Sequence, residues 1–335
     1  MIARRRLLIA LGLNALAVGM SAPLANAAPP PGKVLHLGLL YAIPEKFDPE
    51  SRPVDRAIVE SLRAQGYEVG RNLVLEFRSG KGDAQRVPEA AAELVRLKVD
   101  AIITVGTEAM LAARDATRTI PTIMIGGTDP VGTGVVVSLS RPGGNITGMS
   151  TNAAEISAKR VQLLKEAVPK LSRVAVLWNS SSRSMTLQFQ QIEIASPSLG
   201  VIVQSIRVSG SDDLDKAFAA IAESHPGGLI VLFGPLRGND LPRIVEFVTS
   251  NRLPTVFELG QGVRGGGLME FGPSFAELAR HVGTYVDKIA NGANPGDLPV
   301  QEPTEFELII NIKAARTMGL TIPPSLLLRA DQVIE

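Results

Sequence analysis

The sequence contains no cysteine, only three histidines, and 4% aromatic residues. Without cysteine the chain has no disulfide, no thiol nucleophile and no thiol for a lipid anchor. The histidines, at positions 36, 225 and 281, are spaced for neither a metal site nor a catalytic triad. A Gly-x-Ser-x-Gly elbow, a His-Glu-x-x-His motif and a phosphate loop ending in Gly-Lys-Ser/Thr are also missing. We therefore predict no catalytic residues, no metal and no cofactor. A protein that is not an enzyme is expected, and an enzyme on the same scaffold is the alternative.

Long hydrophobic runs are confined to the N-terminus. Met1–Arg6 carries three arginines and no acid, Leu7–Met20 is mostly apolar, and Ala25–Ala27 has small residues where a signal peptidase reads. This layout predicts a signal peptide over residues 1–27, cleaved after about Ala27, and hence a periplasmic protein without direct membrane insertion. The arginines also loosely fit a twin-arginine signal, and a retained N-terminal helix is disfavoured by the flanking prolines. The remaining 308 residues have a formal charge of −2, which gives no reason to expect nucleic acid as a partner.

After residue 33, short runs rich in Val, Ile and Leu alternate with segments of helical spacing. The expected strands are 34–41, 72–77, 101–105, 121–125, 173–177, 201–208, 228–233 and 255–259. The expected helices are 56–65, 84–98, a helix from 107, 155–168, 184–195, 212–224, 239–250 and a helix from 275. Continuous apolar strands alternating with helices are typical of parallel sheets covered on both faces. The series occurs twice, with a turn-rich break at Ser140–Asn145, so we predict an α/β protein of two doubly wound parallel-sheet lobes. A single large sheet is the alternative.

Residues that directly follow the strands are the first candidates for a binding site, because open parallel sheets bind ligands beyond the carboxyl ends of their strands. Five of the 14 aromatic residues lie at or beside such ends, which favours an apolar, partly aromatic cleft. The alternative is that each aromatic residue merely caps the core of its lobe. The five are Tyr41, Trp178, Phe233, Phe257 and Phe271.

Polar residues at the same strand ends suit a ligand with both signs of charge. Thr107 begins a helix whose free N–H groups could hold a carboxylate. Asp129 could receive an ammonium group, although Asp before Pro is also a common turn residue. Glu258 could be a further acceptor or a solvated acid, and we expect Glu270 to be a solvated loop acid. Ser150, with Thr151, lies where the chain is expected to pass between the lobes and could face the cleft.

Several segments resemble those of ABC-transporter substrate-binding proteins related to tryptophan and tyrosine uptake proteins. The similarity covers nearly the whole chain from about residue 35. Its most specific parts are Asp-Pro-Val-Gly-Thr-Gly at 129–134 and Ser-Arg-Pro-Gly-Gly-Asn-Ile-Thr-Gly at 140–148. Further matching stretches are 91–100, 163–169, 173–179, 266–269 and 330–335. By position, the resemblance assigns Thr107, Asp129, Ser150 and Asn179 to the cleft. The chain departs from the family pattern at the cleft edge, in the longer loop 42–49, in the serines 180–182, and in Glu270-Phe271.

The resemblance implies the fold of type I periplasmic binding proteins, with two lobes joined by hinge strands. We expect the N-terminal lobe to comprise 33–149 plus about 274–298, and the C-terminal lobe 150–273 plus about 299–335. The expected function is capture of a small, amino acid-like and possibly aromatic ligand, delivered to an ABC permease in the inner membrane. Asp129 would meet the cationic group and Thr107 the anionic group, while Tyr41, Trp178 and Phe257 flank the remainder. An exported module that senses a ligand for a membrane receptor is the alternative, and a cytosolic regulator is disfavoured by the signal peptide.

Overall fold

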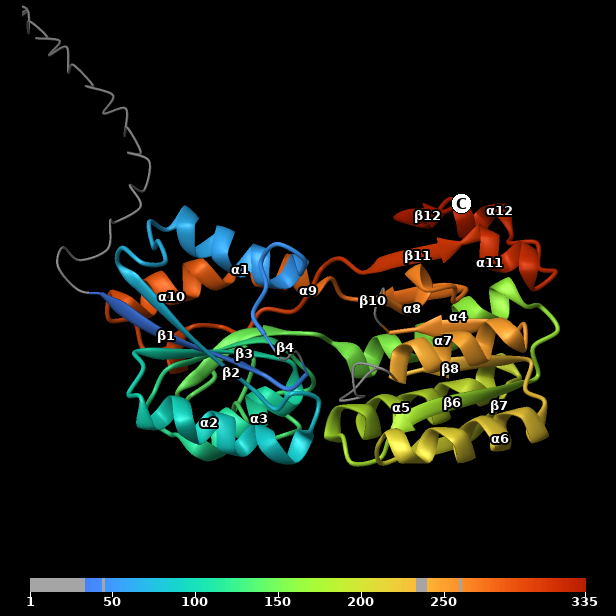
Figure 1. The fold of residues 1–335 in the computed structure, drawn as a ribbon, viewed down its shortest axis with the longest axis horizontal. Helices are drawn as coiled ribbons and strands as arrows, with labels where there is room; N and C mark the ends of the chain where they lie inside the picture. The colour runs from blue at the N-terminus through green and yellow to red at the C-terminus, as the bar shows by residue number, and fades with distance from the viewer. Residues whose placement is uncertain (1–33, 44–45, 233–239, 259–260) are drawn as a thin grey trace, which may run out of the picture.

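The computed structural model describes residues 34–43, 46–232, 240–258 and 261–335. The expected signal peptide and Phe233 therefore lie outside the described residues. Within them, no helix combines the length and apolar character needed to cross a bilayer. The chain forms two lobes that lie side by side, each built on its own sheet (Figure 1).

The first sheet has five parallel strands in the order β2-β1-β3-β4-β5. Its strands are β1 (Leu35–Tyr41), β2 (Leu73–Ser79), β3 (Ala101–Val105), β4 (Thr122–Gly127) and β5 (Ile146–Ser150). Both faces of β1 are buried, because Leu37 and Leu39 join one hydrophobic cluster while Leu40 joins another. Burial on both faces explains why this strand reads as a continuous apolar run.

Helices cover each face of this sheet. One face carries α1 (Pro53–Ala64), α9 (Phe275–Ala279) and α10 (Val282–Ala290), and α1 packs against both of the others. The opposite face carries α2 (Val87–Arg96) and α3 (Thr107–Ala116), which pack against each other. Short 3₁₀ helices occur at η1 (Ala84–Arg86) and η4 (Pro295–Asp297). Part of the helix expected over 84–98 is thus a 3₁₀ turn.

The second sheet has seven strands in the order β12-β11-β10-β9-β8-β6-β7. Five of them, in the order β7-β6-β8-β9-β10, repeat the strand order of the first sheet and are all parallel. Only the β10–β11 pairing is antiparallel among the described strands. The strands are β6 (Arg173–Asn179), β7 (Ile202–Val208), β8 (Gly228–Val231), β9 (Thr255–Phe257), β10 (Met269–Gly272), β11 (Glu307–Asn311) and β12 (Gln332–Ile334).

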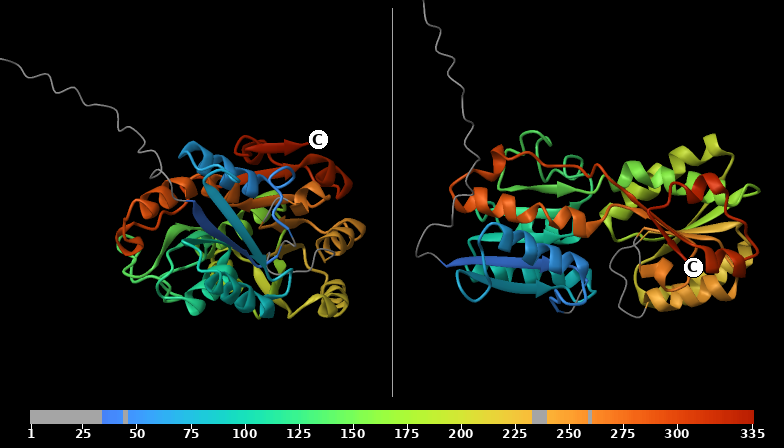
Figure 2. Two further views of the ribbon diagram at one scale, coloured as in Figure 1. Left: turned by 60° about the vertical axis from the view of Figure 1, so that its left-hand side comes forward. Right: turned by 90° about the horizontal axis from the view of Figure 1, so that it is seen from above.

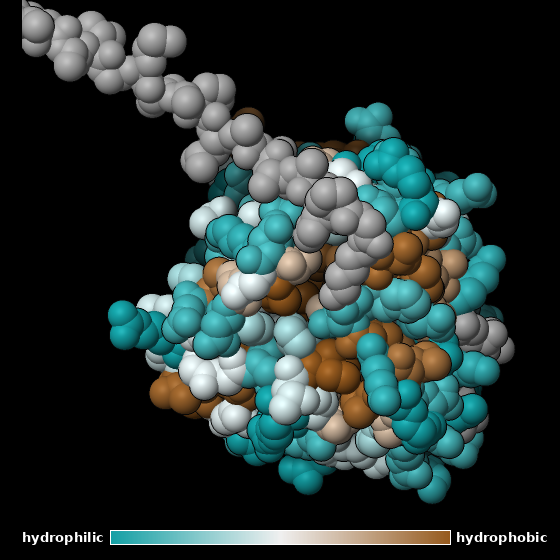
Figure 3. Space-filling model, turned by 90° about the vertical axis from the view of Figure 1, so that its left-hand side faces the viewer, coloured by the Kyte–Doolittle hydropathy of each residue, from teal (hydrophilic) through white to brown (hydrophobic). Residues whose placement is uncertain are grey.

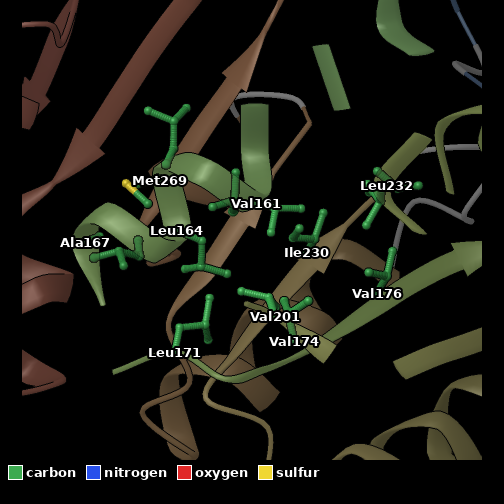
Figure 4. Packing of buried hydrophobic residues seen from close by; sticks show 14 of the residues in the cluster. Val161, Leu164, Ala167, Leu171, Val174, Val176, Val201, Ile230, Leu232 and Met269 are labelled. Carbon is green, nitrogen blue, oxygen red and sulfur yellow. The ribbon is translucent and has the colours of Figure 1, made fainter. Parts of the chain in front are cut away.

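Helices also cover both faces of the second sheet. Figure 4 shows α4 residues, including Val161 and Leu164, packed over strand residues such as Val176 and Ile230. Helices α4 (Ala153–Ala167) and α5 (Arg183–Ala195) lie on that face, and α6 (Leu214–Ser224) and α7 (Asp240–Ser250) lie on the other. The shorter helices are α8 (Gln261–Arg264), α11 (Ile312–Thr317), α12 (Pro324–Leu327), η2 (Ser196–Leu199) and η3 (Ser211–Asp213). The prediction of two doubly wound parallel-sheet lobes is confirmed.

The chain passes between the two sheets three times: after β5, after β10 and before β11 (Figure 2). The first and third crossings are hydrogen-bonded to each other, because Ser150 donates its N–H to the carbonyl of Gln301, and Gln301 donates to Gly148. Asn152, in the first crossing, has a left-handed backbone with φ of 53°. Paired crossings of this kind form a hinge about which the lobes can rotate.

Candidate functional site

In the N-terminal lobe, the loops after β3 and β4 are joined by Thr107. Gly106, with φ of 88°, turns the chain so that α3 begins directly at Thr107. The Thr107 hydroxyl accepts the N–H of Thr128 at 3.0 Å. Thr107 is buried, and its hydroxyl fixes the loop after β4 against the start of α3.

Asp129 forms the turn that follows Thr128. Its backbone is left-handed, with φ of 43°, and its Oδ1 accepts the N–H of Gly132 at 2.8 Å. The turn role is therefore present in the structure. Contact of Asp129 with a ligand stays a prediction.

Ser150 ends β5 at the first crossing. Its side chain is only 2% exposed, and among the described residues its hydroxyl has no hydrogen-bond partner. The next residue, Thr151, shares a hydrogen bond of 3.1 Å between its Oγ1 and that of Thr128. At the end of β5, the Ser150 hydroxyl, which has no partner among the described residues, is thus followed along the chain by the Thr151 hydroxyl, which is bonded to Thr128.

In the C-terminal lobe, the start of α5 follows the end of β6. Asn179 accepts the N–H of Ser181, and Ser182 caps α5 by accepting the N–H of Met185. Ser182 also donates its hydroxyl to Glu108 Oε1 at 2.5 Å. Because Glu108 is in the first turn of α3, the helix starts of the two lobes meet.

A second contact joins the lobes beside the first. Ser184, in the first turn of α5, donates its hydroxyl to Thr128 Oγ1 at 2.9 Å. The carboxyl-terminal edges of the two sheets therefore face each other, which is the arrangement in which open parallel sheets bind ligands.

Behind Ser184 lies a buried polar network centred on Arg160 of α4. Its guanidinium, fully buried, donates to the carbonyl of Phe271, to Ser157 Oγ and to Gln188 Oε1, at 2.8, 3.0 and 2.8 Å. It also lies 3.8 Å from Glu258 Oε1. Burial lowers the pKa of Arg160, and the charges of Glu258 and Glu270 oppose that shift.

Gln188 links this network to the lobe interface. Its Nε2 donates to Glu258 Oε1 at 2.9 Å and to Ser184 Oγ at 3.4 Å. Glu258 is 8% exposed, so it is not a solvated loop acid. The expectation for Glu270 was wrong: it is 7% exposed, because it lies in β10 between β9 and β11. We call Thr107, Thr128, Thr151, Ser157, Arg160, Ser184, Gln188 and Glu258 the interlobe network.

Three of the four described aromatic residues at the strand ends, Tyr41, Trp178 and Phe257, lie in the cores. Tyr41 is 2% exposed, packs against Phe77, and donates its hydroxyl to Asp55 at 2.6 Å; burial and that carboxylate raise its pKa. Trp178 stacks on Phe189 with ring centroids 4.7 Å apart. Phe257 is 1% exposed within the C-terminal lobe. Core packing, the alternative for each, is present, and contact with a ligand stays a prediction.

Of the predicted site residues, the hydrogen bonds of the interlobe network connect Thr107 and Glu258. Asp129 and Ser150 are represented in it by the residues next to them in the chain, Thr128 and Thr151. Sequence reasoning missed Arg160 and Gln188. A signal was available for both, since Arg160 lies four residues before Leu164 and Gln188 four before Ile192, and both of these are buried. A polar residue at a core position of an amphipathic helix indicates a buried network.

The outer side of the N-terminal lobe, which faces away from the C-terminal lobe, carries both hydrophobic and hydrophilic side chains (Figure 3). On this side, hydrophobic side chains come to the surface in separate areas between hydrophilic ones (Figure 3). Among the described residues, polar groups from both lobes are brought together at the starts of α3 and α5. No group of three or more His, Asp or Glu suited to a metal occurs in the part of the chain that the structure describes.

A family model described as ABC transporter substrate binding protein matches residues 51–334. A tyrosine-binding protein of Clostridioides difficile (strain R20291) is 27% identical over 268 residues, which is 79% of this chain and 76% of that protein.

Two solved structures each superpose with a TM-score of 0.82 at 25% identity and cover 90% of this chain. One is an ABC domain from Streptococcus pneumonia in complex with L-Trp, matched over 99% of its length. The other is a conserved domain protein from Vibrio cholerae, matched over 100%. The prediction that the chain is a binding protein and not an enzyme is confirmed by the family match. The chain belongs to the family of ABC transporter substrate-binding proteins, and it is the solute-binding component of such a transporter.

Proposed function

We propose that this chain is exported to the periplasm, captures an aromatic amino acid between its lobes, and delivers it to a permease in the inner membrane. The observation that carries the proposal is the meeting of the two sets of strand ends at Glu108–Ser182 and Thr128–Ser184. The ligand class is supported by two similar proteins, a tyrosine-binding protein and a structure that holds L-Trp.

The polar groups at the interface suit the two charges of an amino acid. The unpartnered Ser150 hydroxyl and the free N–H groups at the start of α3 can receive the carboxylate. Asp129 and Glu258 supply carboxylate oxygens for the ammonium group. In this proposal Asn179 lies at the polar edge. Tyr41, Trp178 and Phe257, which pack in the cores of their own lobes, would support the strand ends that face the side-chain end of the ligand. Meeting both charges matters because an unpaired buried charge is costly.

Closure would couple binding to delivery. A ligand that touches both lobes binds the closed state better than the open state and therefore increases its population. The permease would recognise the face that both lobes form together when closed.

The export part of the proposal has its own test. Protein released from the periplasm should begin at Ala28, because cleavage is expected after Ala27. N-terminal sequencing measures this directly. A chain that still begins at Met1 in the soluble fraction would contradict it.

Thermal unfolding tests the ligand class. At 100 times its dissociation constant, a ligand specific for the native state adds about 2.7 kcal/mol, which raises Tm by about 5–10 °C for lobes of this size. We expect such a shift with L-tyrosine, L-tryptophan or L-phenylalanine, and none with L-glutamate or D-glucose. Unchanged Tm with all three aromatic amino acids would reject the ligand class.

Substitutions at Asp129 separate its turn role from its ligand role. Asp129→Asn keeps an oxygen for the Gly132 N–H and tolerates a left-handed backbone, but it removes the charge. We expect the affinity for the aromatic amino acid to fall more than about tenfold, or about 1.4 kcal/mol. Isothermal titration measures the affinity, and the ligand-free Tm serves as the control. Asp129→Ala should lower both, and an Asn variant with normal affinity would exclude the ligand role.

A further inference from the structure

The orientation of the Gln188 amide is fixed by its neighbours. Its Oε1 accepts from Arg160 at 2.8 Å and from Ser157 at 3.1 Å, and its Nε2 donates to Glu258 at 2.9 Å. A guanidinium can only donate, and an ionised carboxylate can only accept. Turning the amide over would therefore set two donors against each other at Arg160 and two acceptors against each other at Glu258.

This orientation sets the direction of the next hydrogen bonds. The second N–H of Gln188 is directed at Ser184 Oγ, which accepts it at 3.4 Å. The hydroxyl hydrogen of Ser184 is then available for Thr128 Oγ1, at 2.9 Å in the opposite lobe. Thr128 in turn has its own hydrogen left for Thr151 Oγ1, at 3.1 Å. A hydrogen-bond chain of one direction thus runs from Arg160 to the first crossing.

One bond of this chain exists only when the lobes touch. Arg160, Gln188 and Ser184 are on α4 and α5 of the C-terminal lobe, whereas Thr128 follows β4 of the N-terminal lobe. Thr128 is 3% exposed and Ser184 is 9% exposed in this arrangement. When the lobes separate, both hydroxyls return to water.

We propose that Gln188 and Arg160 are positioning residues for lobe closure, which hold the Ser184 hydroxyl aimed at Thr128 and connect Glu258 to the same hydrogen bond. The inference rests on the proposed function in so far as a solute-binding protein works by closing. It adds that the closed state is selected by the interlobe network, which begins behind Ser184 in the C-terminal lobe. A ligand that contacts Glu258 would act on the same hydrogen bonds that join the lobes.

The absence of cysteine permits a test that needs no ligand. A Glu108→Cys, Ser182→Cys background places two thiols where the lobes meet. Because a cysteine side chain is shorter than that of Glu108, a short bis-methanethiosulfonate reagent should bridge the pair. The rate of bridging then reports the population of the closed state. Ser182→Cys removes the N-cap of α5, but every variant is compared within this same background, so this effect is common to all of them.

In this background, Ser184→Ala, Thr128→Val and Gln188→Leu should each slow bridging about fivefold, the factor that about 1 kcal/mol of lost hydrogen bonding produces. Thr128→Ser keeps the hydroxyl and should restore the rate. Gln190→Leu alters an exposed glutamine on the same helix and should leave the rate unchanged. The Ser184 and Thr128 variants also keep the test decisive if Gln188→Leu fails to fold.

A coupling measurement separates positioning from general damage. If Gln188 acts through Ser184 and Thr128, Gln188→Leu should have little further effect on bridging once Thr128 is valine. Independent, additive effects would overturn the proposal, as would equal rates in all the variants. Failure of every aromatic amino acid to bind would reject the ligand class but would not alter these rates, so the two failures are distinguishable.

Discussion

Replacing Arg160 with methionine removes a fully buried positive charge from α4 and keeps an unbranched side chain in its place. The guanidinium loses three hydrogen bonds, to the Phe271 carbonyl, Ser157 and Gln188, and its ion pair with Glu258. We expect this variant to be among the most destabilised single substitutions in the C-terminal lobe.

The size of the loss in unfolding free energy on Arg160→Met follows from two opposing effects. Burial lowers the pKa of Arg160, so the charged side chain is held at a desolvation cost that methionine would relieve. Against this, Glu258 and Glu270 are both buried and lose a cation that acts on them. Removing one partner of a buried pair costs about 3–5 kcal/mol, because the other charge stays buried. The loss of carboxylate pairing is the larger effect, and it is a large part of the roughly 5–15 kcal/mol that stabilises a domain.

Urea unfolding, monitored by tryptophan fluorescence, measures this loss of stability in the C-terminal lobe. Trp178 is the single tryptophan of the chain, and it lies at the end of β6 in the same hydrophobic cluster as Val161 and Leu164. Its emission therefore reports the C-terminal lobe. Arg183→Met is the matched control, because Arg183 is exposed on α5 and should change stability by less than about 0.5 kcal/mol.

A double-mutant cycle shows whether the mechanism is correct. Glu258→Gln removes the carboxylate charge, so Arg160→Met should cost less in that background than in the wild type. A free energy of unfolding for Arg160→Met that lies within about 1 kcal/mol of the wild-type value would refute the reasoning. Strict additivity with Glu258→Gln would refute the charge-based explanation.

Two further predictions concern the N-terminal lobe. Gly148→Ala should cost about 3 kcal/mol or more, because its φ is 124° and the added Cβ would lie 2.3 Å from the Met124 carbonyl oxygen. Gly70→Ala, with φ of 83° and no atom within 4 Å, should cost only about 1 kcal/mol, and equal losses in urea unfolding would contradict the packing argument. Burial raises the pKa of Tyr285 to about 12, so the unfolded chain releases this proton from about pH 10, whereas the native state keeps it. This contribution to stability is complete below pH 10 and is lost as the pH rises towards 12, so Tyr285→Phe, which also loses the hydrogen bond to Pro299, should flatten the decline. Equal declines of the urea midpoint in both proteins between pH 9 and 12 would contradict this assignment.

The layers of the fold could be predicted because they depend on local patterns. Residues 34–41 are expected to form a buried strand, and the sequence Leu-His-Leu-Gly-Leu-Leu-Tyr at 35–41 forms β1 between two hydrophobic clusters. The helix expected from residue 275 begins there, and Ser274 caps it by accepting the N–H of Glu277. Such features are determined by residues that are close together in the chain, so they can be predicted from a single sequence.

The contacts between the lobes could not be predicted in the same way. Thr128 and Ser184 are 56 positions apart, and their hydrogen bond depends on the angle between two lobes. Strand-end position singles out Glu258, whose contact with a ligand stays a prediction. Its partners Gln188 and Arg160 lie within helices, where only their place on the buried face distinguishes them. Trp178 and Phe257, also at strand ends, fill the core of their own lobe, and their contact with a ligand stays a prediction.

The division between apolar cores and a polar interface has a consequence for how the protein works. Each hydrophobic cluster of the described residues is centred on one lobe, whereas Glu108–Ser182 and Thr128–Ser184 join the lobes by hydrogen bonds. Separating the lobes therefore leaves both cores intact and exchanges these bonds for bonds to water, at about 0.5–1.5 kcal/mol each. Moving a two-state equilibrium from mostly open to mostly closed needs only about 5.5 kcal/mol of differential binding, and a ligand with both charges met can supply it. An interface joined by buried apolar side chains would hold the lobes shut without a ligand, so the polar interface is what allows the ligand to control closure.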